Sequence, residues 1–125
     1  MKNISLIVFV DPPEKIKLEE DPKDQLMESQ TKKLVCTSRG ISEPPSYIEW
    51  SVVDSLGRKI HENEVSGILE SDPTDMRYKN VLLKSTVRMV MLRKYNRYSV
   101  ACSIIYQDKK VLSQTKTIKV ACKFS

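Results

Sequence analysis

Residues 98–106 read Tyr-Ser-Val-Ala-Cys-Ser-Ile-Ile-Tyr, and this stretch decides the fold class. Every second position carries a side chain suited to a core, and these are Tyr98, Val100, Cys102, Ile104 and Tyr106. Side chains at i and i+2 point to the same side of a β-strand. The alternation therefore predicts a strand with one buried face.

The same two-residue alternation recurs along the chain. Its rows are Leu34, Cys36 and Ser38; Ile48, Trp50 and Val52; Val87, Met89 and Met91; and Ile118 and Val120. Turn-forming residues separate the rows, including residues 55–58 (Ser-Leu-Gly-Arg) and residues 107–110 (Gln-Asp-Lys-Lys), which are typical of a hairpin tip. Helical periodicity is nearly absent, and its best candidate, residues 14–27, is interrupted by Pro22. The pattern predicts an all-β antiparallel sandwich of about 7–8 strands.

Length and composition limit the class of protein to which the chain can belong. The chain has 125 residues, with 40% hydrophobic and 30% charged residues and a net charge of +5. This composition excludes a disordered polyelectrolyte and is enough for one folded domain with a real core. No apolar run approaches the roughly 20 residues needed to cross a bilayer, so we expect no membrane insertion within this segment.

The first thirteen residues have a different character from the rest. An apolar stretch, residues 4–10, follows Met1-Lys2-Asn3 and ends at Asp11 and two prolines. We interpret residues 1–13 as an N-terminal strand or inter-domain connector, with a leader remnant as the alternative, and residues 14–125 as the folded domain. Asn3-Ile-Ser is a glycosylation sequon, which makes Asn3 a candidate acceptor.

Two cysteines and a tryptophan occur at a spacing that bears on the fold. Cys102 lies 66 residues after Cys36, and Trp50 lies 14 residues after Cys36, all on predicted inward faces. This arrangement resembles the immunoglobulin fold, in which a disulfide joins strands B and F and a strand C tryptophan packs against it. The resemblance implies a Cys36–Cys102 bridge, worth about 4 kcal/mol by loop closure, and an oxidising compartment. The alternating rows place Trp50, Val87, Met89 and Val100 in the same core.

Several segments are similar to the C2-like second domain of nectin-type and nectin-like adhesion receptors. They are Val10-Asp-Pro-Pro-Glu14, Cys36-Thr-Ser-Arg-Gly40, Ile48-Glu-Trp50, residues 85–91, residues 98–102 and residues 114–120. Insect receptors of the beaten-path and sidestep kind are a second resemblance. Val100 stands where many immunoglobulin domains have a corner tyrosine, and this departure argues against a variable-type domain. The resemblance implies an extracellular, cell-surface module.

Cys122 is left without a predicted partner. Cys122 follows Ile118 and Val120 at two-residue intervals, so its side chain is expected on the same inward side of the strand. It is therefore either a buried thiol or bonded to another domain or chain.

Catalytic patterns are missing from the sequence. His61, in the charged segment 60–64, is the single histidine, and it has no His or Cys at metal-ligand spacing. We therefore expect a solvated loop there, no enzyme, no metal and no cofactor. A nucleophile would also need a base, and only His61 is available.

A binding surface is expected on the C–F–G sheet face. Its outward candidates are Tyr47, Glu49, Ser51, Ala101, Ser103 and Ile105, joined by Lys109 and Lys110 at the hairpin tip. The first function hypothesis is a recognition or adhesion module of a multi-domain cell-surface receptor. Such a module either binds another cell-surface or secreted protein, or a second copy of itself, or acts as a spacer domain. The alternative is a secreted ligand or decoy that binds glycosaminoglycan through Lys109, Lys110 and Lys116. A cytosolic domain of the muscle kind is the third, and nucleic-acid binding is not expected because exposed aromatics are scarce.

Overall fold

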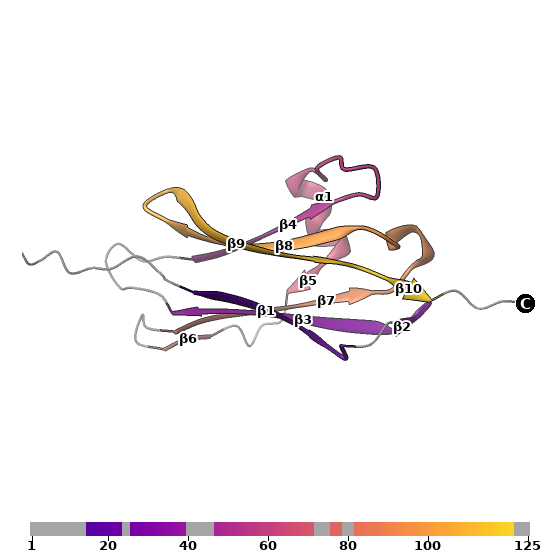
Figure 1. Ribbon diagram of the computed structural model, residues 1–125, viewed down its shortest axis with the longest axis horizontal. Helices are drawn as coiled ribbons and strands as arrows, with labels where there is room; N and C mark the ends of the chain where they lie inside the picture. Colours follow the sequence, from indigo (N-terminus) through magenta and orange to yellow (C-terminus); the bar gives the residue numbers. More distant parts are fainter. Residues whose placement is uncertain (1–14, 24–25, 40–46, 72–75, 79–81, 122–125) are drawn as a thin grey trace, which may run out of the picture.

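The computed structural model describes residues 15–23, 26–39, 47–71, 76–78 and 82–121. Within them the chain forms two layers of antiparallel strands packed face to face (Figure 1). This architecture confirms the predicted all-β sandwich, because each layer buries one face of its alternating strands.

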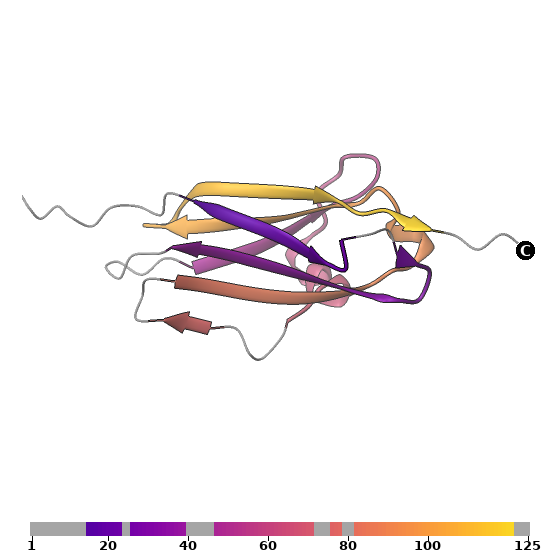
Figure 2. The same ribbon diagram turned by 60° about the horizontal axis from the view of Figure 1, so that its bottom comes forward.

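One layer contains β1 (Ile16–Asp21), β3 (Thr31–Arg39), β7 (Leu82–Val90), β5 (Glu70–Ser71) and β6 (Met76–Tyr78). Its order is β1-β3-β7, with β5 and β6 both pairing with β7. Figure 2 shows β3 and β7 running side by side along the molecule.

The second layer contains β4 (Tyr47–Val53), β8 (Ser99–Tyr106) and β9 (Lys109–Thr117) in the order β4-β8-β9. The strands β2 (Leu26–Met27) and β10 (Val120–Ala121) pair in parallel at one end of the sandwich. The 3-10 helix η2 (Arg93–Tyr95) joins β7 to β8 across the same end. The β8–β9 hairpin lies at the opposite end (Figure 1).

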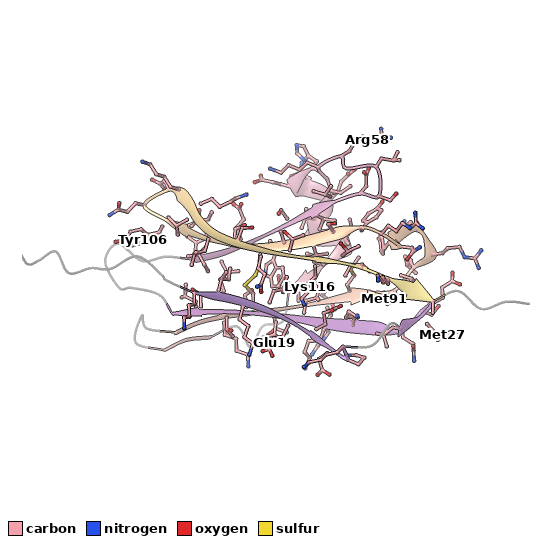
Figure 3. The ribbon with its side chains drawn as sticks, in the orientation of Figure 1. Glu19, Met27, Arg58, Met91, Tyr106 and Lys116 are labelled. Carbon is pink, nitrogen blue, oxygen red and sulfur yellow. A yellow bond between two sulfur atoms is a disulfide. The ribbon has the colours of Figure 1, made fainter. Side chains whose placement is uncertain are left out.

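The core lies between the layers and is held by the predicted disulfide. Cys36 of β3 and Cys102 of β8 are bonded, with their Cα atoms 6.4 Å apart, and both are fully buried. Figure 3 shows this bond between the two layers. Val87, Met89 and Val100 are buried around it, and Trp50 packs against the same cluster. Burial of these side chains is the main favourable term in the stability of such a domain.

A helix replaces the solvated loop expected around His61. The helix α1 spans Glu62–Ile68, and the His61 side chain caps it by accepting a hydrogen bond from Asn63 N at 3.2 Å. Val65 and Ile68 lie three residues apart and pack against the core from one face of the helix. His61 itself is exposed, as expected, but the expected loop is wrong from Glu62 onward. A short helix forms there because Val65 and Ile68 give it one apolar side, which the charged residues around them obscured in the sequence.

The predicted hairpin tip is a two-residue turn. Gln107 and Asp108 have φ values of 52° and 62°, so both central residues are left-handed. This geometry is that of a type I′ turn, whose twist matches the twist of the strands it joins. Lys109 and Lys110 belong to β9 rather than to the turn itself.

Candidate recognition surface

The face of the β4–β8–β9 layer that points away from the core is the candidate surface, called here the outer β4–β8–β9 face. The strand registers place the side chains of twelve residues on this face. They are Tyr47, Glu49, Ser51 and Val53 from β4; Ser99, Ala101, Ser103 and Ile105 from β8; and Lys110, Ser113, Thr115 and Thr117 from β9.

The registers arrange these residues in cross-strand rows. Tyr47 pairs with Ile105, which pairs with Lys110, at the hairpin end of the face. The next row is Glu49, Ser103 and Ser113. Directly opposite side chains in adjacent strands lie about 5 Å apart, so each row is a contact unit. The structure therefore brings the predicted residues of β4 and β8 together with Lys110 of β9, which was also predicted, and with Ser113, which was not.

Ser103 and Ile105 were expected to be exposed, and this expectation is wrong. They lie on the predicted side of the sheet, but only 1% of Ser103 and 7% of Ile105 is exposed. Both belong to the central strand, and neighbours on each side flank them: Ser113 Oγ accepts from the Ser103 hydroxyl at 3.1 Å, and Tyr47 and Lys110 flank Ile105. A partner would touch the flanking strands before it touched these two side chains.

Apolar surface is available at the hairpin end of the face. Tyr47 is 50% exposed and Val111 is 38% exposed. Val111 is the extra residue of a β-bulge, because the β8–β9 register shifts between Ile104 and Ile105. The bulge breaks the simple alternation of β9, which is why the sequence pattern did not single out Val111.

The outer β4–β8–β9 face carries fewer charged side chains than the outer face of the other layer. On the outer β4–β8–β9 face, Glu49 and Lys110 are the charged residues among the twelve. The outward positions of β1, β3, β5 and β7 carry Lys17, Glu19, Asp21, Lys33, Glu70, Lys84 and Arg88. Interface centres are depleted in charged residues and enriched in aromatic ones. The charge-poor face with an exposed tyrosine is therefore the better docking surface of the two.

The basic candidates fall at different places. Lys109 and Lys110 are exposed at the start of β9, beside Asp108. Lys116 is half-buried on the opposite side of β9 from Lys110, since it pairs with Val100 of the core-facing row. Lys116 and Lys110 therefore do not share a face of the sheet (Figure 3 labels Lys116).

No catalytic constellation is present in the part of the chain that the structure describes. Within it, no group of three or more His, Cys, Asp or Glu side chains is placed to hold a metal ion. His61 engages the backbone of its own helix. Asn3 and Cys122, like residues 1–13, lie outside the described residues.

Comparison with known proteins bears on the fold. No known protein-family profile and no curated protein matches the chain. Among solved structures, the N-terminal Ig1-2 module of the Drosophila receptor protein tyrosine phosphatase DLAR is similar to it, with a TM-score of 0.58. The chain has an immunoglobulin-like fold. Sequence identity to that structure is 17%, and the match covers 90% of this chain and 50% of that one.

The immunoglobulin-like domain is thus comparable to half of that two-domain module. Helices long and apolar enough to span a bilayer are not found among the described residues. The matching structure is an immunoglobulin module of a receptor.

Proposed function

We propose that this chain is a non-catalytic, extracellular recognition module of a cell-surface adhesion receptor. The observation that carries the proposal is the contrast between the two outer faces. The β4–β8–β9 face has small polar side chains and an exposed tyrosine, whereas the opposite face is densely charged. A partner can cover a charge-poor sheet face at a lower desolvation cost than a densely charged one.

The disulfide supports the extracellular location. A bond such as Cys36–Cys102 persists in oxidising compartments and is rare in the cytosol. A cytosolic domain of the muscle kind is disfavoured for the same reason.

The topology supports the C2-like assignment. Variable-type domains add two strands to the layer that contains strands C, F and G. Here, in the described part of the chain, β4 is followed by a single bridge between Val53 and Lys59 and then by α1. β5 and β6 then pair with β7 in the opposite layer.

The mechanism is surface burial without chemistry. Tyr47 supplies an amphipathic anchor, and exposed Ser113 and Thr115 supply hydroxyl groups that can donate and accept hydrogen bonds. Glu49 and Lys110 lie on opposite edges of the face and would set the orientation of a partner, because rim charges act mainly on specificity.

A matched pair of substitutions tests the proposal. Fluorescent streptavidin tetramers of the biotinylated chain are used to stain intact cells whose glycosaminoglycans have been removed by heparinase and chondroitinase. Thr115→Arg changes the outer β4–β8–β9 face, and Thr31→Arg makes the same change at an exposed strand position of the other layer.

We expect protease-sensitive staining that falls by at least about fivefold for Thr115→Arg and is unchanged for Thr31→Arg, since a buried, unpaired charge strongly disfavours a contact. Equal staining by both variants, or no protease-sensitive staining on any cell type, contradicts the proposal.

A further inference from the structure

A second surface lies at the end of the sandwich opposite the hairpin. It is built from the turn that contains η2 and from the segment that leads into β10, and it is called here the basic corner. Its charged residues are Arg93, Lys94, Arg97 and Lys119, all of them exposed. None of them lies on the outer β4–β8–β9 face.

Backbone hydrogen bonds fasten the two halves of the basic corner together. Arg97 N donates to Ile118 O at 2.8 Å, and Ile118 N donates to Tyr98 O at 2.7 Å. Val120 N donates to the Asn96 side-chain oxygen at 3.0 Å. Lys119 is therefore held next to the turn that carries the other three cations.

Packing beneath the corner keeps its backbone in place. Tyr95 is buried, and its ring lies 5.2 Å from that of Tyr98, centroid to centroid. Ile118 and Val120 are buried on either side of Lys119. The cations thus project from a rigid support, which lowers the entropy cost of binding a ligand.

The charge of the corner is weakly compensated. Glu28 reaches Arg93 at 3.4 Å, an ion pair whose two side chains are both partly exposed. The Lys94 ammonium lies 5.3 Å from the centre of the Tyr95 ring, which carries no net charge. Among the described residues, no other ion pair engages the four cations within the bonding limit of 4 Å.

The backbone at Arg97 has a conformation that is unusual for an arginine. Arg97 has a φ of 73°, in the left-handed region, where glycine or asparagine is favoured. An exposed arginine at such a position sacrifices some backbone stability without any compensating burial. A role for its guanidinium group explains why arginine stands there.

We propose that the basic corner binds the sulfate groups of a glycosaminoglycan chain. Guanidinium groups form paired hydrogen bonds with sulfate-like oxyanions, and two of the four cations are arginines. The Cys36–Cys102 disulfide is typical of secreted and cell-surface proteins, which meet such chains, and in this respect the inference rests on the extracellular location proposed above. Tyr47, Leu56, Val90 and Val111 are the large apolar side chains with the greatest exposure in the described residues, and none belongs to the corner, so it lacks an apolar wedge for insertion into a lipid surface.

The basic corner is a different location for polyanion binding from the one that the sequence predicted. The sequence reading placed it at Lys109, Lys110 and Lys116, but Asp108 adjoins the first two, and Lys116 is half-buried on another side of β9. The basic corner holds more exposed cations on one support. It is separate from the outer β4–β8–β9 face, so either proposal can fail without the other.

The test compares two variants with the same loss of charge. Lys94→Gln combined with Arg97→Asn removes two cations from the corner, and asparagine is compatible with the left-handed backbone at position 97. Lys109→Gln combined with Lys110→Gln removes two cations from the hairpin end. Both are compared with the unchanged chain by heparin-column elution and by titration with a heparin octasaccharide, after thermal unfolding has shown that each is folded.

We expect the corner variant to bind the octasaccharide about tenfold more weakly and to elute at lower salt, with a change of less than about twofold for the hairpin variant. Glu28→Gln, which removes the competing carboxylate from Arg93, is expected to raise affinity. An equal or larger loss in the hairpin variant overturns the proposal. Binding to phosphatidylserine vesicles that heparin does not displace also overturns it, because the corner would then be a lipid site.

Discussion

The indole nitrogen of Trp50 donates a hydrogen bond to the Ser85 hydroxyl at 2.9 Å, across the two layers of the sandwich. Trp50 pairs in register with Cys102, and Ser85 pairs in register with Cys36. The disulfide therefore links β3 to β8, and the hydrogen bond links their neighbours β7 and β4 at the same level of the sandwich. One link is covalent and the other fixes the orientation of the largest side chain in the core.

Removing the serine hydroxyl should leave the indole N–H without this acceptor. We predict that Ser85→Ala lowers the free energy of unfolding by about 1–2 kcal/mol, the usual cost of an unsatisfied polar group in a core. Urea denaturation followed by tryptophan fluorescence measures it. Ser55→Ala, in an exposed turn, is the control and should change stability by less than about 0.5 kcal/mol. A loss at Ser85 as small as the control contradicts a role for the hydrogen bond.

A lysine is buried inside the sandwich next to a less buried carboxylate. Lys32 Nζ lies 2.7 Å from Glu20 Oε1, and the two side chains are 3% and 17% exposed. We predict that Glu20→Gln costs about 2–3 kcal/mol, because the buried lysine loses the charge of this carboxylate, and that Lys32→Met costs about 1 kcal/mol, because Glu20 can still reach water. Chemical denaturation of both variants provides the comparison. A larger cost for Lys32→Met reverses the predicted order and contradicts this account.

The cap of α1 gives a third prediction. His61 accepts from Asn63 N at 3.2 Å, so His61→Ala should lower stability by about 0.5–1 kcal/mol, within the range measured for helix N-caps. His61→Asp should retain or raise stability, since an aspartate caps well and its charge favours a helix N-terminus. Thermal unfolding of the two variants distinguishes them. Equal melting temperatures would show that the cap does not contribute.

The β8–β9 turn can be improved. Gln107 and Asp108 both adopt left-handed φ values, which Asn and Gly accept at lower cost. We predict that Gln107→Asn combined with Asp108→Gly raises the free energy of unfolding by about 1 kcal/mol. Placing Asn-Gly at residues 55–56, where the turn at Asp54 and Arg58 has another geometry, is the control and should not stabilise. A destabilised hairpin variant argues against the type I′ turn.

The alternating pattern predicted most of the fold for a simple physical reason. Apolar and polar residues alternate in a strand that is buried on one face, so rows such as Val100, Cys102 and Ile104 can be recognised in the sequence. The same parity also places Lys32 on the inward face of β3, with Leu34 and Cys36. Its burial was missed because a charged residue was not expected in a core, where a carboxylate from another strand stabilises it.

The surface was harder to predict than the core. The alternation of residues predicts on which side of a sheet a side chain lies, but not how much of it is exposed. The exposed fraction depends on how neighbouring strands cover the side chain, as Ser103 and Ile105 show. The bulge next to Ile105 shifts the alternation in β9, and no sequence signal marks it. The basic corner depends on contacts between Arg97 and Ile118, which only the tertiary fold brings together.

The central claim is that a disulfide-bonded, immunoglobulin-like sandwich acts outside the cell. It is tested most directly by peptide mapping, under non-reducing conditions, of the protein isolated from its natural source after alkylation of free thiols. We predict a peptide pair joined through Cys36 and Cys102, with neither cysteine alkylated. Recovery of both cysteines as alkylated thiols would contradict the covalent link between the layers and the extracellular assignment that depends on it.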